Sequence, residues 1–182
     1  MNNAGGTFHS PIMQVSKKGW DLMQNFNLTS AFLASKAAAT YWMRHKIPGC
    51  IINVSSTEGM KACPGFTPYS AAKAGLINFT KCLATELGPY GIRVNCIAPD
   101  YTPTPGTTGT GRDSPERDRL VASMIPLRRQ GTPDDMAGPV VFFASNLSNW
   151  VTGQTLVVDG GALVAARVEG AFPELDQNKP TR

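Results

Sequence analysis

The chain has 182 residues, a length typical of one domain with a sizeable core, and 42% of them are hydrophobic. The formal net charge is +4, and the basic residues are scattered, so no stripe indicates a nucleic-acid partner. No stretch reaches the roughly 18 apolar residues of a membrane span, and no secretory signal opens the chain. The 4 cysteines lack metal-ligand spacing and only 2 histidines occur, so we expect reduced thiols, no metal and a cytoplasmic location.

The first quarter of the sequence predicts a short opening motif followed by two helical segments. Asn2-Asn3-Ala4-Gly5 opens the chain, and a loop follows up to residue 15. A helical pattern begins after Ser16, whose hydroxyl predicts an N-cap. A second helical segment covers 28–44, and Asn27 lies at the junction of the two. Taken alone, Asn27 indicates only a helix cap or a kink.

The most informative stretch covers residues 50–75. The apolar run Cys50–Val54 predicts a buried strand that delivers polar groups at its end, among them Ser56. A loop rich in glycine and proline follows. A long helix is then expected, on which Tyr69 and Lys73 lie one turn apart on the same side. A serine at a strand end therefore faces a tyrosine and a lysine at the start of a helix.

These three side chains suit proton transfer to or from a substrate oxygen. A phenol has an ordinary pKa of about 10, and bringing it to about 7 needs roughly 4 kcal/mol of differential stabilisation. Lys73 and a cationic cofactor ring are the expected sources, because a nearby positive charge favours the phenolate. Ser56 can donate a hydrogen bond where charge develops on the substrate oxygen. The trio thus favours carbonyl reduction or alcohol oxidation; the plain alternative is an exposed tyrosine near a solvated lysine.

The second half of the sequence predicts two more strands with helices between them. The strands are expected near 92–98 and 155–159. Between them, helices should begin after Ser114 and Thr132, each followed by proline at the first helical position. The apolar run Val140–Phe143 is predicted to lie in the core.

Two segments of the second half predict irregular structure. The glycine-rich stretch 106–111 follows no strand that opens directly into a long helix. We therefore expect a loop there and not a nucleotide-binding motif. The tail 164–182 becomes polar and carries two prolines, so we expect it to lie outside the domain.

In this order, the motifs resemble the short-chain dehydrogenase/reductase family of the Ser…Tyr-x-x-x-Lys type. The similarity covers about residues 1–163 and includes Asn2-Asn3-Ala4-Gly5 at the start, Arg93–Pro99 as the sixth strand and Leu156–Gly161 as the last strand and its turn. The resemblance implies an α/β fold and a catalytic tetrad. Its four members would be Asn27, Ser56, Tyr69 and Lys73.

The same resemblance implies NAD or NADP as cofactor and a small-molecule carbonyl or alcohol as substrate. Most relatives carry Pro-Gly where this chain has Pro99-Asp100, so Asp100 is a departure. The positions that match the family's cofactor contacts are Asn3, Ala4, Gly5, Tyr69, Lys73, Pro99, Thr102 and Thr104.

A complete family member would carry a βαβαβ unit with a glycine-rich phosphate loop before Asn2. We therefore expect the domain 1–163 to be the C-terminal part of a doubly wound, Rossmann-like parallel sheet, N-terminally truncated, followed by the tail 164–182. The missing strands would leave a sheet edge and apolar surface without cover. Because related proteins pair through their long helices, we expect a homo-oligomer, either a dimer or a tetramer.

Two functions stay open from the sequence. In the first, the chain is an NAD(P)-dependent oxidoreductase in which Tyr69 is the general acid or base. In the second, it is a catalytically inactive module that only binds or dimerises. The tetrad favours the first and the missing phosphate loop the second, so cofactor binding discriminates between them.

Overall fold

The sheet of the protein is parallel, as predicted. The computed structural model describes residues 1–104 and 114–165, so the stretch 106–111 and most of the tail lie outside the described residues. Three strands pair in the order β1-β2-β3. They are β1 (Gly49–Val54), β2 (Ile92–Pro99) and β3 (Thr155–Val158).

The opening motif extends this sheet beyond β1, on the side opposite β2. Asn2 pairs in parallel with Asn53. The Asn2 N–H donates to the Ile52 carbonyl at 2.8 Å, and the Val54 N–H donates to the Asn2 carbonyl at 3.0 Å. The opening motif therefore contributes a single β-bridge to the sheet and not a full strand.

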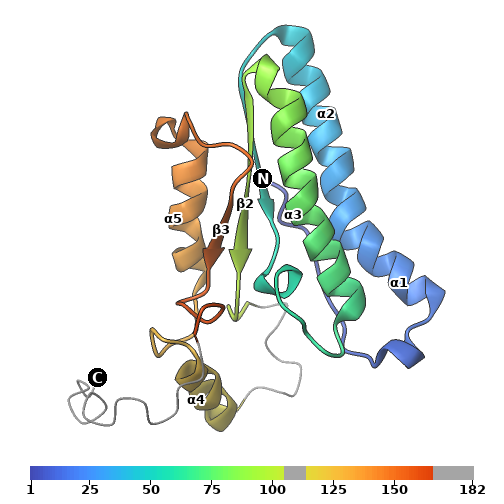
Figure 1. Cartoon of the computed structure of the whole chain (residues 1–182), viewed down its shortest axis with the longest axis vertical. Coiled ribbons are helices and arrows are strands. Elements are labelled where there is room, and N and C mark those ends of the chain that lie inside the picture. The colour runs from blue at the N-terminus through green and yellow to red at the C-terminus, as the bar shows by residue number, and fades with distance from the viewer. Residues whose placement is uncertain (105–113, 166–182) are drawn as a thin grey trace.

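Helices cover both faces of the sheet, which gives the expected α/β layering (Figure 1). Helices α2 and α3 pack on one face, α5 packs on the other, and α4 lies beyond the carboxyl ends of the strands (Figure 1). A π-helical segment, η2 (Asn25–Thr29), joins α1 to α2 without a break. The helices are α1 (Lys17–Gln24), α2 (Ser30–His45), α3 (Thr67–Leu87), α4 (Pro115–Met124) and α5 (Pro133–Ala144).

The predicted helix starts have a clear local cause. The hydroxyls of Ser16, Ser114 and Thr132 each accept a hydrogen bond from the backbone N–H three residues on. Thr132 and Asp135 form a reciprocal capping box, which satisfies two otherwise unpaired donors. The helix expected to open at Tyr69 begins slightly earlier, at Thr67, because a proline in the first turn loses no helical hydrogen bond.

Each face of the sheet has its own apolar cluster. Between the sheet and helices α2 and α3, the cluster consists of Ala39, Ile51, Ala84, Leu87, Ile92 and Val94. On the α5 side, Ile52, Ile97 and Phe143 form the second cluster. The prediction that the whole run Val140–Phe143 is core was wrong: Phe143 is 2% exposed but Val141 is 64% exposed. A helix turns each successive side chain by about 100°, so consecutive residues cannot all face the sheet.

The cysteines, the possible metal ligands and the helices can be compared with what the sequence predicted. All four cysteines are free thiols. Within residues 1–104 and 114–165, no group of His, Cys, Asp or Glu side chains is arranged to hold a metal ion. None of the helices that the structure describes has the length and apolar character needed to cross a bilayer. The cytoplasmic location stays a prediction.

Candidate active site

Ser56 is held at the carboxyl end of β1 by a short 3₁₀ turn, η3 (Thr57–Gly59). The Ser56 Oγ accepts a hydrogen bond from the Glu58 N–H at 3.2 Å and so caps the turn. The turn rests on helix α3, since a Cβ on Gly59 would lie only 2.7 Å from the Lys73 carbonyl carbon. The neighbouring Ser55 Oγ donates to the Lys73 carbonyl at 2.8 Å. Strand end and helix are thus fixed against each other around Ser56.

Tyr69 and Lys73, the other two residues of the predicted trio, lie one turn apart on the side of α3 that faces the end of β1. The Ser56 side chain lies near the Tyr69 hydroxyl and acts to lower its pKa. The Lys73 Nζ lies 5.5 Å from the centre of the Tyr69 ring and donates to the Val54 carbonyl at 2.8 Å. Lys73 is 4% exposed. The structure therefore brings Ser56, Tyr69 and Lys73 into one cluster where β1 meets α3.

Burial dominates the ionisation of both titratable groups. Burial raises the pKa of Tyr69 to about 12, against a smaller lowering by the nearby Ser56 side chain, and Glu58 and Cys63 raise it further. Burial also lowers the pKa of Lys73 to about 8. Lys73 is not among the groups that shift the pKa of Tyr69 here, and the expected lowering by Lys73 together with a cationic cofactor ring stays a prediction. The phenol therefore holds its proton at neutral pH.

Asn27 joins the cluster from the π-helical segment. Its Oδ1 accepts from the Gly6 N–H at 3.1 Å, and its Nδ2 donates to the Gly6 carbonyl at 2.9 Å and the Met23 carbonyl at 3.0 Å. A Cβ on Gly5 would lie 2.8 Å from this Oδ1 and 3.3 Å from the Lys73 Nζ. Asn27, Gly5 and Lys73 therefore lie side by side. The extra backbone width of a π-helical turn, a feature frequent at functional sites, occurs at this point of the helix.

The expected cofactor contacts at the start of the chain lie beside this cluster. Asn3, Ala4 and Gly5 are exposed and follow directly on the residue that pairs with β1. Because Gly5 approaches both Asn27 and Lys73, this segment forms an accessible wall next to the buried amino group. Because Gly5 has no side chain, a ligand could approach the backbone closely at this position.

The other expected cofactor contacts follow β2. Pro99 ends the strand, and Thr102 and Thr104 are half-buried in the segment after it. The Thr102 Oγ1 donates to the Asp100 carbonyl at 3.2 Å. Asp100 forms an ion pair with Lys61 at 2.8 Å, which gives the unusual aspartate a partner from the loop after Ser56. Sequence reasoning missed this pair, although opposite charges on two loops at one sheet edge were a usable signal.

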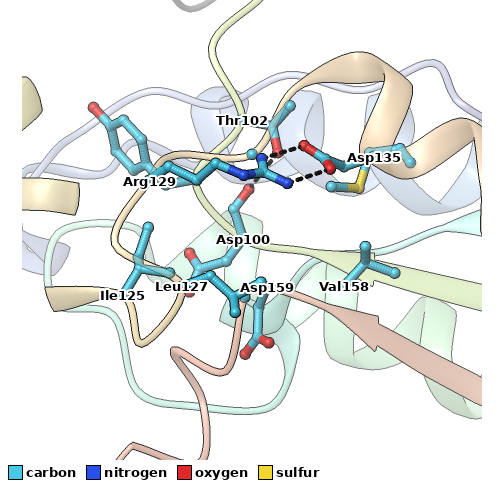
Figure 2. A pocket seen from close by; sticks show the side chains of 12 residues that line it. Asp100, Thr102, Ile125, Leu127, Arg129, Asp135, Val158 and Asp159 are labelled. Carbon is cyan, nitrogen blue, oxygen red and sulfur yellow. Dashed lines mark hydrogen bonds and ion pairs between the residues drawn. The ribbon is translucent and has the colours of Figure 1, made fainter. Parts of the chain in front are cut away.

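A cavity of about 140 Å³ lies next to Thr102 at the carboxyl ends of β2 and β3. In Figure 2, Asp100 and Thr102 lie on one side of it, and Arg129 points toward Asp135 across it. Arg129 holds both oxygens of Asp135, at 2.6 Å and 2.7 Å, and this bidentate pair keeps the pKa of the carboxyl far below its usual range. Tyr69 does not line this cavity, so the cavity adjoins the Ser56 cluster without containing it.

A parallel sheet with helices on both faces defines a Rossmann-like protein, and a hydroxyl, a phenol and an amino group lie together at the carboxyl edge of its sheet. Residues 1–162 match the family described as Enoyl-(Acyl carrier protein) reductase. The chain belongs to the short-chain dehydrogenase/reductase family.

Individual relatives agree in sequence and in structure. The chain is 42% identical over 161 residues to a 3-oxoacyl-[acyl-carrier-protein] reductase FabG of Chlamydia muridarum, covering 88% of this chain and 63% of that protein. A gluconate 5-dehydrogenase of Burkholderia cenocepacia, solved with NADP and tartrate, superposes with a TM-score of 0.85 at 32% identity, over 91% of this chain and 64% of the other. A 4-hydroxyisoleucine dehydrogenase complexed with NADH gives 0.82 at 30% identity, over 91% and 68%. The chain thus spans about two thirds of the length of these relatives.

Proposed function

We propose that this chain acts in an NAD- or NADP-dependent oxidoreductase that interconverts a carbonyl and a secondary alcohol. The observation that supports this most is the cluster of Ser56, Tyr69 and the buried Lys73, whose Nζ lies 5.5 Å from the centre of the Tyr69 ring. The names of the relatives point the same way, because each is a reductase or a dehydrogenase. A small molecule with a carbonyl or a secondary hydroxyl is the proposed substrate.

In the proposed mechanism, each of the four residues acts at a stated atom. The Ser56 Oγ donates a hydrogen bond to the substrate oxygen and orients it toward the Tyr69 hydroxyl. Tyr69 gives its proton to that oxygen during reduction and takes it back during oxidation. Lys73 supplies positive charge beneath the phenol, and Asn27 fixes the backbone that faces Lys73. Since burial raises the pKa of Tyr69, the phenol carries the proton that it would give to the substrate oxygen during reduction.

The residues beside Lys73 fit the nicotinamide ribose of such a cofactor. The bound cofactor would supply or accept the hydride, which no protein side chain can do. The Lys73 ammonium is a donor suited to ribose hydroxyls, and the exposed wall Asn3–Gly5 offers backbone groups next to it. Pro99, Thr102 and Thr104 would contact the nicotinamide from the end of β2. A Cβ on Gly5 would invade the space between Asn27 and Lys73, so this position needs glycine.

Titration with NADH and with NADPH, followed by cofactor fluorescence, tests this proposal. We expect saturable binding in the micromolar range, and Gly5→Val should abolish it because its side chain meets Asn27 and Lys73. Gly138→Val is a matched control, since a Cβ there has nothing within 4 Å. A folded chain that binds neither cofactor would contradict the proposal. It would favour a module that only binds or dimerises.

One observation favours an assembly role alongside catalysis. Large apolar side chains of α1, η2 and α2 are exposed, and they comprise Leu22, Phe26, Phe32 and Leu33. Apolar clusters of this kind on long helices mark protein–protein contacts. We propose that this surface joins two copies of the chain into a homo-oligomer. Light scattering should then give at least twice the monomer mass, and Phe32→Glu should reduce it.

A further inference from the structure

The backbone of Lys61 is attached to the turn that Ser56 caps. The Lys61 N–H donates to the Thr57 carbonyl at 3.0 Å, and the Met60 N–H donates to the same carbonyl at 2.9 Å. Thr57 is fully buried, and the Ser56 Oγ accepts a hydrogen bond from the Glu58 N–H at 3.2 Å. A change in the position of Lys61 would therefore be transmitted to Ser56 through one short turn.

Asp100 begins the segment after β2 that carries the proposed nicotinamide contacts. Its N–H donates to the Val158 carbonyl of β3 at 3.3 Å, and its carbonyl accepts from the Thr102 Oγ1 at 3.2 Å. The next residue is held as well, because the Gly131 N–H donates to the Tyr101 carbonyl at 3.0 Å. The main chain of Asp100 is therefore fixed both to the sheet and to Thr102.

An ion pair between Lys61 and Asp100 joins these two segments at the carboxyl edge of the sheet. The Lys61 Nζ lies 2.8 Å from the Asp100 Oδ2, and the two side chains are 38% and 19% exposed, so water screens the pair only in part. The pair of Lys17 with Asp21 is different, because its side chains are 83% and 46% exposed and lie one turn apart in the same helix. The Lys61–Asp100 pair connects residues 39 positions apart, so it restrains the distance between two separate segments.

We propose that Lys61 and Asp100 are positioning residues, whose ion pair sets the distance between Ser56 and the segment at Thr102. This inference rests on the proposed oxidoreductase function, in which Ser56 orients the substrate oxygen and the segment at Thr102 contacts the nicotinamide. The pair would thus align substrate and cofactor, which affects the rate within the bound complex more than the affinity for either ligand. Most relatives carry glycine at the position of Asp100, and glycine could not form this pair.

Backbone amide exchange of the folded chain, followed by NMR, tests the restraint without any substrate. Asp100→Asn should speed exchange of the Met60 and Lys61 N–H groups about three- to fivefold, a range that a partly exposed ion pair can produce. Lys61→Met should speed exchange of the Gly131 N–H, which lies in the other segment, by a similar factor. Asp21→Asn is the matched control, because it removes the carboxylate of the ion pair within α1 and should change neither segment. Effects confined to the substituted residue's own segment would overturn the inference.

Steady-state reduction of butane-2,3-dione with NADH and with NADPH tests whether the restraint serves catalysis. Lys61→Met and Asp100→Asn should each lower kcat about fivefold and change KM by less than about twofold, a split that a loss of folded protein would not produce. The double variant should be no slower than either single one, since the second substitution removes a charge that has already lost its partner. The exchanged pair Lys61→Asp/Asp100→Lys should recover most of the wild-type kcat.

The two experiments separate this inference from the proposed function. Wild-type kcat in both single variants, or losses that add up in the double variant, would overturn the inference and leave the oxidoreductase proposal standing. A folded chain that binds neither cofactor would contradict the oxidoreductase proposal. Where no turnover is measured, amide exchange decides on the restraint: loosening of each segment by the substitution in the other supports it, and its absence overturns it.

Discussion

The two faces of the sheet differ sharply where the strands approach their carboxyl ends. On the α5 face, Ile52, Ile97 and Phe143 pack against one another as an apolar cluster. On the α3 face at the same level, buried polar residues join buried apolar ones such as Leu76, and the polar ones comprise Asn53, Ser55, Lys73 and Thr80. One face therefore stabilises the fold by removing apolar surface from water, whereas the other buries polar groups at a cost.

The free-energy cost of burying polar groups on the α3 face is offset because these groups form hydrogen bonds. The Asn53 Nδ2 donates to the Thr80 Oγ1 at 2.8 Å, and Thr80 donates to the Leu76 carbonyl at 2.9 Å. Lys73 donates to the Val54 carbonyl at 2.8 Å. The proposed chemistry therefore lies on the face whose buried polar groups are held by hydrogen bonds. Substitutions on the two faces should thus separate activity from stability.

The largest expected effect is on the α3 face, from Tyr69→Phe. Removing the hydroxyl removes the proposed proton carrier, so turnover should fall by about 10²–10⁴-fold. Thermal stability should change little, because the ring and its packing remain. Steady-state turnover and thermal unfolding measure the two effects, with the exposed Tyr90→Phe as control. A folded Tyr69→Phe chain that keeps its turnover would rule out the proposed role.

On the α5 face, Phe143→Ala should act the opposite way. Phe143 is 2% exposed, and truncating such a ring typically costs about 3–5 kcal/mol of the free energy of unfolding. The neighbouring Phe142 is 36% exposed, so Phe142→Ala should cost less than about half as much. Urea unfolding gives both values. Equal losses at the two positions would mean that the α5 face does not carry the apolar cluster described here.

Local sequence signals predicted much of the fold. Ser16, Ser114 and Thr132 cap their helices because capping depends only on neighbouring backbone groups. The spacing of Tyr69 and Lys73 placed them one turn apart, since helix geometry is regular. The strand positions followed from short apolar runs.

Properties that depend on contacts between distant segments could not be predicted in this way. The raised pKa of Tyr69 reflects burial, which the spacing of residues does not give. The ion pair of Lys61 with Asp100 joins loops 39 residues apart in the chain. These features belong to the candidate site, so the site was less predictable than the fold.

The buried charge on the α3 face should leave a signature in the pH dependence of stability. Lys73 has a pKa of about 8 in the folded chain, below the ordinary 10.5. Between these values the unfolded chain binds more protons, so stability rises with pH across this window. Lys73→Met lacks the buried charge, and its stability relative to wild type should fall by about 2 kcal/mol from pH 8 to pH 10.

The wild-type curve alone would not isolate this effect. Burial raises the pKa values of Tyr69 to about 12 and of Cys96 to about 11, and both groups lower stability as pH rises above their ordinary pKa values. Subtracting the variant removes these common contributions. Lys81→Met, at an exposed position of α3, should track wild type throughout. A pH-independent difference between wild type and Lys73→Met would contradict the lowered pKa.

The smallest expected effect lies outside both faces, in the segment between α4 and α5. Arg128 has a φ of 58°, which costs a residue other than glycine about 1–2 kcal/mol. Its Nη1 donates to the Ser123 carbonyl at 2.6 Å, an exposed hydrogen bond that offsets little of this cost. Arg128→Gly should therefore raise the free energy of unfolding by about 0.5–1 kcal/mol, after allowing for the greater chain entropy of glycine.

Arg128→Ala separates strain from the lost hydrogen bond, because it removes the guanidinium and keeps the strained backbone. Arg128→Ala should be less stable than wild type and Arg128→Gly more stable, both by urea unfolding. If Arg128→Gly is no more stable than Arg128→Ala, the left-handed backbone conformation at residue 128 does not destabilise the protein. Neither variant touches Ser56, Tyr69 or Lys73, so turnover should stay at the wild-type level. A change in turnover would mean that this segment couples to the α3 face through the neighbouring cavity, and that the two faces are less separate than their buried groups indicate.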